Sequence, residues 1–171
     1  LARDCLMEPE ASIAADLVRL FQLKFDPALA PEQRAEASVI RRQIESGLEG
    51  ITNADEDRIL RRYLNLVDST LRTNCYQRHA KGERKEYLSF KLDSKKVAEL
   101  PSPRPMFEIF VYSTRMEGVH LRGGKVARGG IRWSDRREDF RTEVLGLVKA
   151  QMVKNVVIVP VGSKGGFVLK R

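Results

Sequence analysis

Residues 120–171 read HLRGGKVARGGIRWSDRREDFRTEVLGLVKAQMVKNVVIVPVGSKGGFVLKR. The middle of this stretch predicts a helix that begins at Ser134 or Asp135 and runs to about Lys154, because apolar residues recur there on one helical face. Residues 155–161, NVVIVPV, form a continuous apolar run, which is typical of a strand buried on both faces. A helix followed by such a strand indicates an α/β layer rather than a separate helical bundle.

Glycines flank three cationic residues in the same stretch, Arg122, Arg128 and Lys164. A cation between glycines lies where the backbone can approach a ligand closely, so the pattern favours a pocket for an anion. Taken alone, GSKGG (162–166) also fits a tight turn with a solvated lysine. It is not a phosphate-binding P-loop, because GxxxxGK[ST] is absent, and no GxGxxG follows a predicted strand.

The basic residues are concentrated in this region. The chain has 31 Lys+Arg and 23 Asp+Glu, a net charge of +8. Residues 1–119 contain 19 basic and 19 acidic residues, whereas residues 120–171 contain 12 basic and 4 acidic ones. A localised excess of this kind implies an acidic partner, which is a nucleic acid, an acidic small molecule or an acidic protein surface.

The first part of the chain, residues 1–76, is predicted to be a helical segment. Apolar residues at helical spacing predict one helix over residues 11–25 and a second from Pro31 to Gly50. Asn53 is a typical N-cap for a third helix that carries apolar residues as far as Leu71. Ordinary amphipathicity accounts for this segment, so packing and partner contact are its expected roles.

The remainder, residues 77–171, is predicted to be part of a domain built from a sheet and helices. A charged linker over residues 77–86 precedes a half-buried strand over residues 87–93. Further strands are expected over residues 106–113 and 119–121. The fold class is therefore predicted as α/β, with an α+β arrangement inside this chain.

Several classes of protein are disfavoured by composition. No apolar run approaches the roughly 18–20 residues that span a bilayer, and charged residues near the start interrupt any signal peptide. Cys5, Cys75, His79 and His120 have no metal-site spacing, so no metal is expected and the thiols indicate a reducing cytoplasm. The first residue is Leu1 rather than methionine, and we expect a piece of a longer protein.

Lys164 is the leading candidate for chemistry. A lysine that is desolvated and placed beside other cations can act as a neutral base, polarise a carbonyl or form a Schiff base. This requires Lys154 and Arg128 to converge on it. The alternative for Lys154 is a cation that stabilises the C-terminal end of its helix, worth about 0.3–1 kcal/mol.

Three segments resemble the substrate-domain signature of glutamate dehydrogenases: RGGIRW (128–133), QMVKN (151–155) and VIVPVGSKGGF (157–167). The longer run from Gly123 to Lys170 closely resembles the large bacterial NAD-specific glutamate dehydrogenases, which carry long extensions on both sides of the catalytic region. DEDRILRRYLNLVDSTLRTN, YLSFKLD and PRPMFEIFVYS resemble the same proteins, so the resemblance covers nearly the whole chain.

The resemblance implies a role for each matching position. Lys164 matches the catalytic lysine, which activates water and polarises the 2-oxo group, and Lys154 matches the lysine that binds the substrate α-carboxylate. Arg128 stands where smaller family members have a lysine that reads the side-chain carboxylate. The turn PVGSKGG is one residue shorter than the usual pattern. The glycines that match the lining of the substrate pocket are Gly129, Gly130, Gly165 and Gly166.

The same resemblance implies the reaction and its partners. The full-length protein is expected to convert L-glutamate to 2-oxoglutarate and ammonia, as a cytoplasmic homo-oligomer that binds neither nucleic acid nor membrane. NAD is expected to bind a domain downstream that also supplies the catalytic aspartate, so no cofactor-binding residue is assigned within residues 1–171. The isolated chain is therefore expected to be inactive.

Two other classes of function stay open at this point. A basic module could bind nucleic acid through residues 120–171, and a helical fragment could be purely structural. Trp133 and Phe140 are nearly the only aromatic residues in the basic stretch, which disfavours the stacking of bases. Binding that weakens steeply as salt rises would identify a nucleic-acid ligand.

Overall fold

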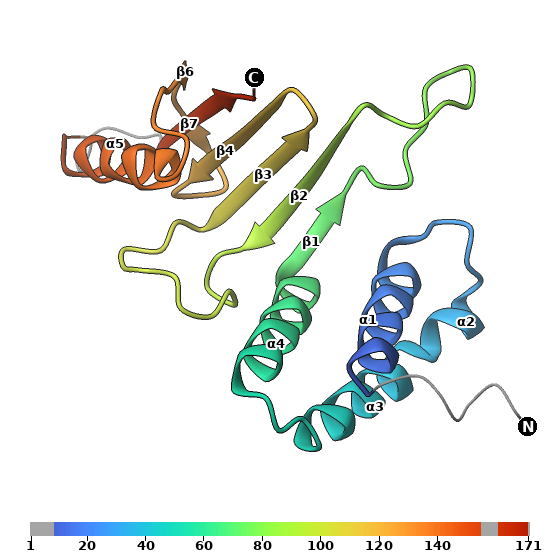
Figure 1. Cartoon of the computed structure of the whole chain (residues 1–171). Coiled ribbons are helices and arrows are strands. Elements are labelled where there is room, and N and C mark those ends of the chain that lie inside the picture. The colour runs from blue at the N-terminus through green and yellow to red at the C-terminus, as the bar shows by residue number, and fades with distance from the viewer. Residues whose placement is uncertain (1–8, 155–160, 171) are drawn as a thin grey trace, which may run out of the picture. The chain divides into compact units, whose positions relative to one another are not determined.

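The computed structural model describes residues 9–154 and 161–170 (Figure 1). The chain divides into two compact units, Leu1–Asp68 and Ser69–Arg171. Across the two described ranges, no helix combines the length and the apolar character that crossing a membrane requires.

Helices make up the first unit. They are α1 (Pro9–Phe25), α2 (Pro31–Ala35), α3 (Ala37–Glu49) and α4 (Ala54–Ser69). Apolar side chains at helical spacing on α1, α3 and α4 meet in one buried cluster, which removes their surface from water and stabilises the unit. The buried members of this cluster are Ile13, Leu17, Leu20, Ile44, Leu48, Leu60 and Leu64.

Most of the predicted helix boundaries are confirmed. Asn53 caps α4, since its Oδ1 accepts hydrogen bonds from the backbone N–H groups of Asp55 (2.9 Å) and Glu56 (3.4 Å). The expected single helix from Pro31 to Gly50 is instead interrupted between α2 and α3. The backbone N–H of Glu36 bonds to the carbonyl three residues earlier, at 3.2 Å, which tightens the chain there into a turn.

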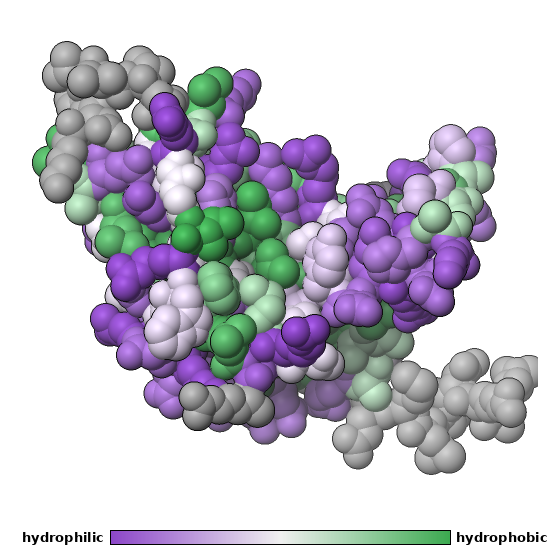
Figure 2. All heavy atoms as spheres, turned by 90° about the horizontal axis from the view of Figure 1, so that it is seen from above, coloured by the Kyte–Doolittle hydropathy of each residue, from purple (hydrophilic) through white to green (hydrophobic). Residues whose placement is uncertain are grey.

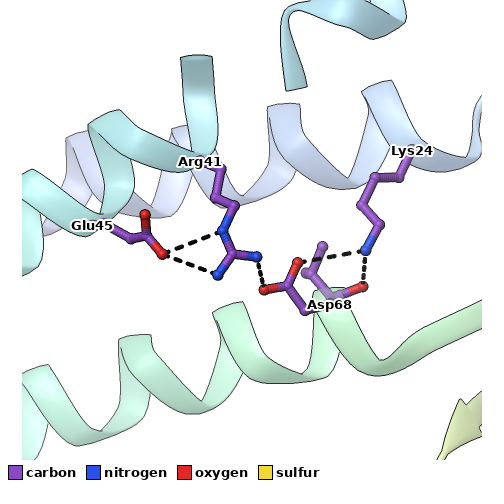
Figure 3. Close-up of polar contacts among 5 residues, drawn as sticks. Lys24, Arg41, Glu45 and Asp68 are labelled. Carbon is purple, nitrogen blue, oxygen red and sulfur yellow. Dashed lines mark hydrogen bonds and ion pairs between the residues drawn. The ribbon is translucent and has the colours of Figure 1, made fainter. Parts of the chain in front are cut away.

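Asp68, near the C-terminal end of α4, connects three helices (Figure 3). Its carboxylate forms an ion pair with Lys24 of α1 at 3.6 Å and is hydrogen-bonded by Arg41 of α3. Lys24 Nζ also donates to the carbonyl of Val67 at 2.7 Å, and Arg41 pairs with Glu45 one helical turn further along α3, at 3.0 Å. One carboxylate therefore holds the end of α4 to two other helices.

The prediction that the third helix continues to Leu71 is wrong. Helix α4 ends at Ser69, and Leu71 lies in strand β1 (Thr70–Thr73). Asn74 follows β1 and locks this segment against β2, because its Oδ1 accepts the N–H of Ser89 at 2.7 Å and its Nδ2 donates to the carbonyl of Tyr87 at 3.0 Å. Pairing with a strand that comes later in the chain overrides the helical periodicity.

Seven strands form one mixed sheet within the described residues, and the predicted α+β arrangement is confirmed. The sheet order is β1-β2-β3-β4-β7-β5, and β6 also pairs with β7. Neighbours from β1 to β7 are antiparallel, whereas β5 and β6 run parallel to β7. The remaining strands are β2 (Tyr87–Asp93), β3 (Phe107–Ser113), β4 (Met116–Arg122), β5 (Ala127–Arg128), β6 (Ile131–Trp133) and β7 (Val161–Leu169).

Helix α5 (Phe140–Lys154) packs against β4 and β7 on one face of this sheet (Figure 1). It begins later than predicted, because the backbone N–H of Ser134 donates to the carbonyl of Phe167 at 2.8 Å and so still pairs with β7. The first helical bonds are accepted by the carbonyl of Asp139. The buried residues beneath the helix are Val119, Leu121, Phe140, Val144, Leu145, Val148 and Val168.

The remaining predictions concern the strands of the second unit and the glycine-rich segment at 162–166. The strands predicted over residues 87–93 and 106–113 are confirmed, and the one over 119–121 is part of the longer β4. The expected turn at 162–166 is wrong: these residues lie inside β7, which hydrogen-bonded neighbours on both sides hold extended. Most of the strand expected at 155–161 lies outside the described residues, and Val161 opens β7.

Candidate active site

Strand β7 places Lys164 on the face of the sheet that α5 covers. Lys164 is paired with Leu121 of β4, and Gly166 is paired with Val119. Residues directly opposite one another in an antiparallel pair have their side chains on the same face. Because Leu121 and Val119 are buried in the cluster beneath α5, the side chain of Lys164 lies on the α5 side as well.

A cavity of about 220 Å³ lies beside Lys164. We call it the Lys164 cavity. Its size suits a small metabolite, since pockets for larger drug-sized ligands measure about 300–1,000 Å³. Strands β6 and β7, helix α5 and the Gly130 segment between β5 and β6 all contribute to its wall. The described residues that line it are Gly130, Ile131, Arg132, Leu147, Lys164 and Gly165.

Two hydrogen bonds connect the walls of the cavity. The N–H of Gly165 donates to the carbonyl of Gly130 at 3.0 Å, which brings together two residues that are far apart in the sequence. On the side of α5, Gln151 Nε2 donates to the carbonyl of Arg128, also at 3.0 Å. The helix, the β5–β6 segment and β7 are therefore connected by direct bonds around Lys164.

The four glycines predicted to line the pocket differ in what surrounds them. A Cβ on Gly129 would lie 1.4 Å from the carbonyl oxygen of Ser163, and one on Gly166 would lie 2.5 Å from Val144 Cγ2. These two glycines permit close packing of backbone and helix. Gly130 and Gly165 line the Lys164 cavity, and a Cβ on Gly130 would meet nothing within 4 Å.

The three predicted cations differ in whether the described structure places them at the Lys164 cavity. Arg128 lies in β5 with an exposed side chain, and it is not among the described residues that line the Lys164 cavity. Lys154 is the last residue of α5, and its side chain lies outside the part of the chain that the structure describes. Lys164 is therefore the one predicted cation that the described structure places at the cavity.

Arg132 also lines the cavity, although it was not among the predicted site residues. Its Nη2 lies 3.4 Å from Glu143 Oε1 of α5, and Ser134 Oγ donates to the other oxygen of Glu143 at 2.6 Å. The sequence does carry a signal for Arg132, because successive residues of a strand point to opposite faces and Arg132 therefore faces away from Ile131 and Trp133. Which of the two faces it occupies depends on the pairing of β6 with β7, which the sequence does not show.

The charges around the cavity suit an anionic ligand. Lys164 and Arg132 contribute two cations, and Glu143 contributes one carboxylate nearby. On the opposite face of the sheet, burial and the neighbouring Arg122 lower the pKa of His120, which is paired with Gly165. Within residues 9–154 and 161–170, no cluster of three or more His, Cys, Asp or Glu residues could hold a metal ion.

Comparison with known proteins identifies the family. The family model described as "Bacterial NAD-glutamate dehydrogenase, catalytic domain" matches residues 43–171. The chain is 58% identical over 159 residues to an NAD-specific glutamate dehydrogenase of Halomonas elongata, covering 93% of this chain and 10% of the relative. It is 57% identical over 168 residues to the NAD-specific glutamate dehydrogenase of Pseudomonas aeruginosa, covering 96% of this chain and 10% of that relative.

A less similar relative matches nearly the whole chain. The NAD-specific glutamate dehydrogenase of Mycobacterium tuberculosis is 49% identical over 170 residues, which is 98% of this chain and 10% of the relative. The chain thus spans about a tenth of the length of these relatives. With the family model matching most of the chain, and with Lys164 in a glycine-lined cavity, this chain belongs to the bacterial NAD-glutamate dehydrogenase family, and its residues 43–171 match the catalytic domain of that family.

Proposed function

We propose that the full-length protein containing this chain catalyses the NAD-dependent oxidative deamination of L-glutamate to 2-oxoglutarate and ammonia. Residues 77–171 are proposed to be the N-terminal part of its substrate-binding domain, and residues 1–76 a helical segment that flanks it. The observation that carries the proposal is the position of Lys164, at the wall of a small glycine-lined cavity in a chain of this family.

In this proposal Lys164 is the catalytic residue. Its amine, in the neutral form, takes a proton from the water that attacks the substrate carbon, and its protonated form polarises the 2-oxo group. The wall of the cavity beside this amine is partly apolar, because Leu147 of α5 contributes to it. Electrostatic interactions are stronger in such a place than in bulk water.

Substrate binding is assigned to the residues that the family resemblance marks. Lys154 would bind the α-carboxylate and Arg128 the side-chain carboxylate. Gly130 leaves room for the substrate at the cavity wall, while Gly129, Gly165 and Gly166 hold β7 close to its neighbours. The chain has no GxGxxG after a strand, so its residues do not fit a dinucleotide site, and NAD is proposed to bind the full-length protein outside residues 1–171.

The basic excess of residues 120–171 is consistent with a small acidic substrate. Several of these cations already have acidic partners within the described residues, which leaves a less continuous basic surface than the sequence suggests. A nucleic acid would require a groove of cations that follows its backbone. The pairs are Lys170 with Glu117, Arg132 with Glu143, Arg136 with Asp139, and Arg141 with Glu108.

We also propose that the full-length protein is a cytoplasmic homo-oligomer. The free thiol of Cys75 suits a reducing compartment. Ile131 and Trp133, on the sheet face opposite α5, are 69% and 57% exposed. Figure 2 shows hydrophobic residues gathered over the strands in the middle of the face seen from above, framed by hydrophilic ones. Exposed apolar surface of this kind is typical of contacts with further protein.

The test is NAD reduction by the full-length protein with L-glutamate, compared between wild type and Lys164→Ala. We expect kcat to fall by about 10²–10⁴-fold in the variant, since it loses an acid–base group. Lys149→Ala, an exposed lysine of α5, is the matched control and should retain wild-type kcat. Absence of glutamate turnover in the wild type would refute the proposed activity, and an unchanged kcat with a raised KM would move Lys164 from catalysis to binding.

A further inference from the structure

The face of the sheet opposite Lys164 carries two basic residues of β4. His120 is paired with Gly165, and a Cβ on Gly165 would lie 3.0 Å from the His120 ring. Gly165 follows Lys164 in β7, and successive residues of a strand point to opposite faces, so His120 faces away from α5. Arg122 lies two residues further along β4 and therefore shares this face.

Two more cations reach the same face from β1 and β2. Lys91 is directly opposite Ile109 of β3, which is opposite His120, so these three residues form one row across the sheet. Arg72 of β1 is directly opposite Lys91 and continues the row. Three strands thus bring together Arg72, Lys91 and Arg122, which we call the basic triad.

Contacts with their neighbours orient two members of the basic triad. Lys91 Nζ lies 3.9 Å from the centre of the Phe107 ring, and Phe107 is paired with Arg122. The ammonium group therefore leans toward Arg122. Arg122 Nη2 donates to the carbonyl of Lys125 at 2.9 Å, which engages one of the five N–H groups of the guanidinium.

Arg122 is also the glycine-flanked cation that the proposed function leaves unused. The N–H of Gly123 donates to the carbonyl of Gly162 at 3.0 Å. A Cβ on Gly123 would lie 2.6 Å from Val161 Cγ1, so this glycine permits close packing against the start of β7. The backbone beside Arg122 is therefore held firmly in the sheet.

Within residues 9–154 and 161–170, no carboxylate lies at ion-pair distance from the basic triad. Asp93, the carboxylate of β2 on this face, accepts the backbone N–H of Lys95 at 3.1 Å. Arg72 and Lys91 are like charges directly opposite one another, which is destabilising. Burial first, and then the charges of Arg72 and Arg122, lower the pKa of Lys91, so Lys91 lies within electrostatic reach of both arginines.

An anion with more than one negative charge would relieve this repulsion. A phosphate group carries about −1.5 to −2 charges at pH 7 and three strong acceptor oxygens, whereas a carboxylate carries a single charge. Guanidinium groups match the geometry of phosphate through paired N–H donors, and an ammonium group adds a point charge. Because the three cations are close together, one compact multivalent anion suits them better than the separate carboxylates of a protein surface.

We propose that the basic triad binds the phosphate group of a small molecule, on the face of the sheet opposite Lys164. The residues assigned to glutamate take no part in this site. The inference therefore does not depend on the proposed activity, and it is measured by binding, without turnover.

The test is calorimetric titration of the full-length protein with inorganic phosphate and with acetate, at equal ionic strength. Wild type should bind phosphate more tightly than acetate. Arg72→Met and Lys91→Met should each weaken phosphate binding about 10-fold, because a charged hydrogen bond is lost. Lys149→Met is the matched control, since Lys149 is an exposed residue of α5 on the other side of the sheet, and it should stay within about twofold of wild type.

Two further variants locate the bound anion and control for folding. Lys164→Ala should leave the affinity for phosphate within about twofold, and saturating L-glutamate should not displace phosphate. Phosphate binding that is lost in Lys164→Ala but kept in Arg72→Met and Lys91→Met would place the anion in the Lys164 cavity and overturn the inference. Lys91→Arg keeps the charge, so it should retain part of the affinity that Lys91→Met loses.

Ribose 5-phosphate and adenosine monophosphate identify the source of the phosphate group. Equal affinities for these two and for inorganic phosphate would show that the phosphate group alone is recognised, and tighter binding of adenosine monophosphate would indicate a nucleotide. Either result supports the site if Arg72→Met weakens the binding. If no phosphate probe binds more tightly than acetate, the inference is wrong and the basic triad faces the carboxylates of a protein surface instead.

Discussion

Arg141 of α5 holds Glu108 of β3 through two parallel hydrogen bonds, Nε to Oε1 and Nη2 to Oε2, each 2.7 Å long. The bond to Glu108 raises the pKa of the Arg141 guanidinium, although burial opposes this. Glu108 is buried and lies directly opposite Leu121 in β4. This pair therefore fixes the start of α5 against the strands that neighbour Lys164.

Arg141→Met should weaken the attachment of α5 to the sheet. The change leaves the buried Glu108 carboxylate without its partner, which costs about 3 kcal/mol. Hydrogen exchange of the α5 amides should speed up accordingly, and the double variant Glu108→Leu with Arg141→Met should recover part of the loss. Unchanged exchange in the single variant would show that apolar packing alone holds the helix.

Gly129→Ala should destabilise the sheet strongly. Its Cβ would lie 1.4 Å from the carbonyl oxygen of Ser163, so the backbone of β7 must move. Strain of this kind costs about 3 kcal/mol or more. Gly130→Ala is the matched control, because the neighbouring glycine has open space at its Cβ position and should change stability by less than about 1 kcal/mol. Thermal unfolding of both variants checks the contrast, and equal midpoints would contradict it.

Asp68→Ala should loosen the helical unit. The variant removes the acidic partner of both Lys24 and Arg41, and we expect a loss of about 1 kcal/mol after allowing for solvent screening at these partly exposed groups. Asp55→Ala breaks an exposed pair with Arg58 and should change stability by far less. Hydrogen exchange at the C-terminal turn of α4 distinguishes them, with similar rates in both variants counting against the role of Asp68.

His120 should make stability depend on pH. Burial first, and the charge of Arg122 second, lower the pKa of the folded His120 below its ordinary value of 6.5. Above about pH 6.5 both states are neutral and the residue has no effect. As pH falls below that value the unfolded chain binds a proton that the folded chain resists, so stability falls. In His120→Gln the thermal unfolding midpoint should change less between pH 7.5 and about pH 5.5 than in wild type. An unchanged dependence of the midpoint on pH would point to another group.

Lys154→Ala in the full-length enzyme should raise KM for glutamate about 10-fold, since it would remove a cation that binds the α-carboxylate. The change should affect kcat much less than Lys164→Ala does. Lys149→Ala, on the same helix, is again the control. If KM stays at its wild-type value, Lys154 serves as a cation at the end of its helix and another group binds the α-carboxylate.

The sequence predicted the elements whose signal is local. Helical spacing and the Asn53 cap placed α1, α3 and α4 nearly correctly, and strand alternation placed β2 and β3. The errors arise where partners are distant. Leu71 fits a helix by periodicity, but β1 forms because β2 is there to pair with it. The glycines around Lys164 fit a turn, but β4 on one side and β5 and β6 on the other make the segment a strand.

The same limit applies to the site. Lys164 stood out because glycines surround it, and its position at a cavity agrees with that signal. The different surroundings of Gly129 and Gly130 cannot be read from two adjacent glycines, because they depend on which atoms of β7 pass by. Arg132 could not be placed at the cavity from the sequence for a related reason, since its face is fixed by the register with Gly166 rather than by its own neighbours in the sequence.

Strand β7 comes last in the described chain, yet it lies between β4 and the pair β5 and β6. During synthesis the ribosome releases β4, β5 and β6 well before the strand that joins them. Until β7 inserts, β4 is an open edge that another nascent chain can pair with, which is a route to aggregation. Gly165 and Gly130 form their hydrogen bond only in that late step, so nascent chains that stop before β7 should depend on chaperones and carry no cavity.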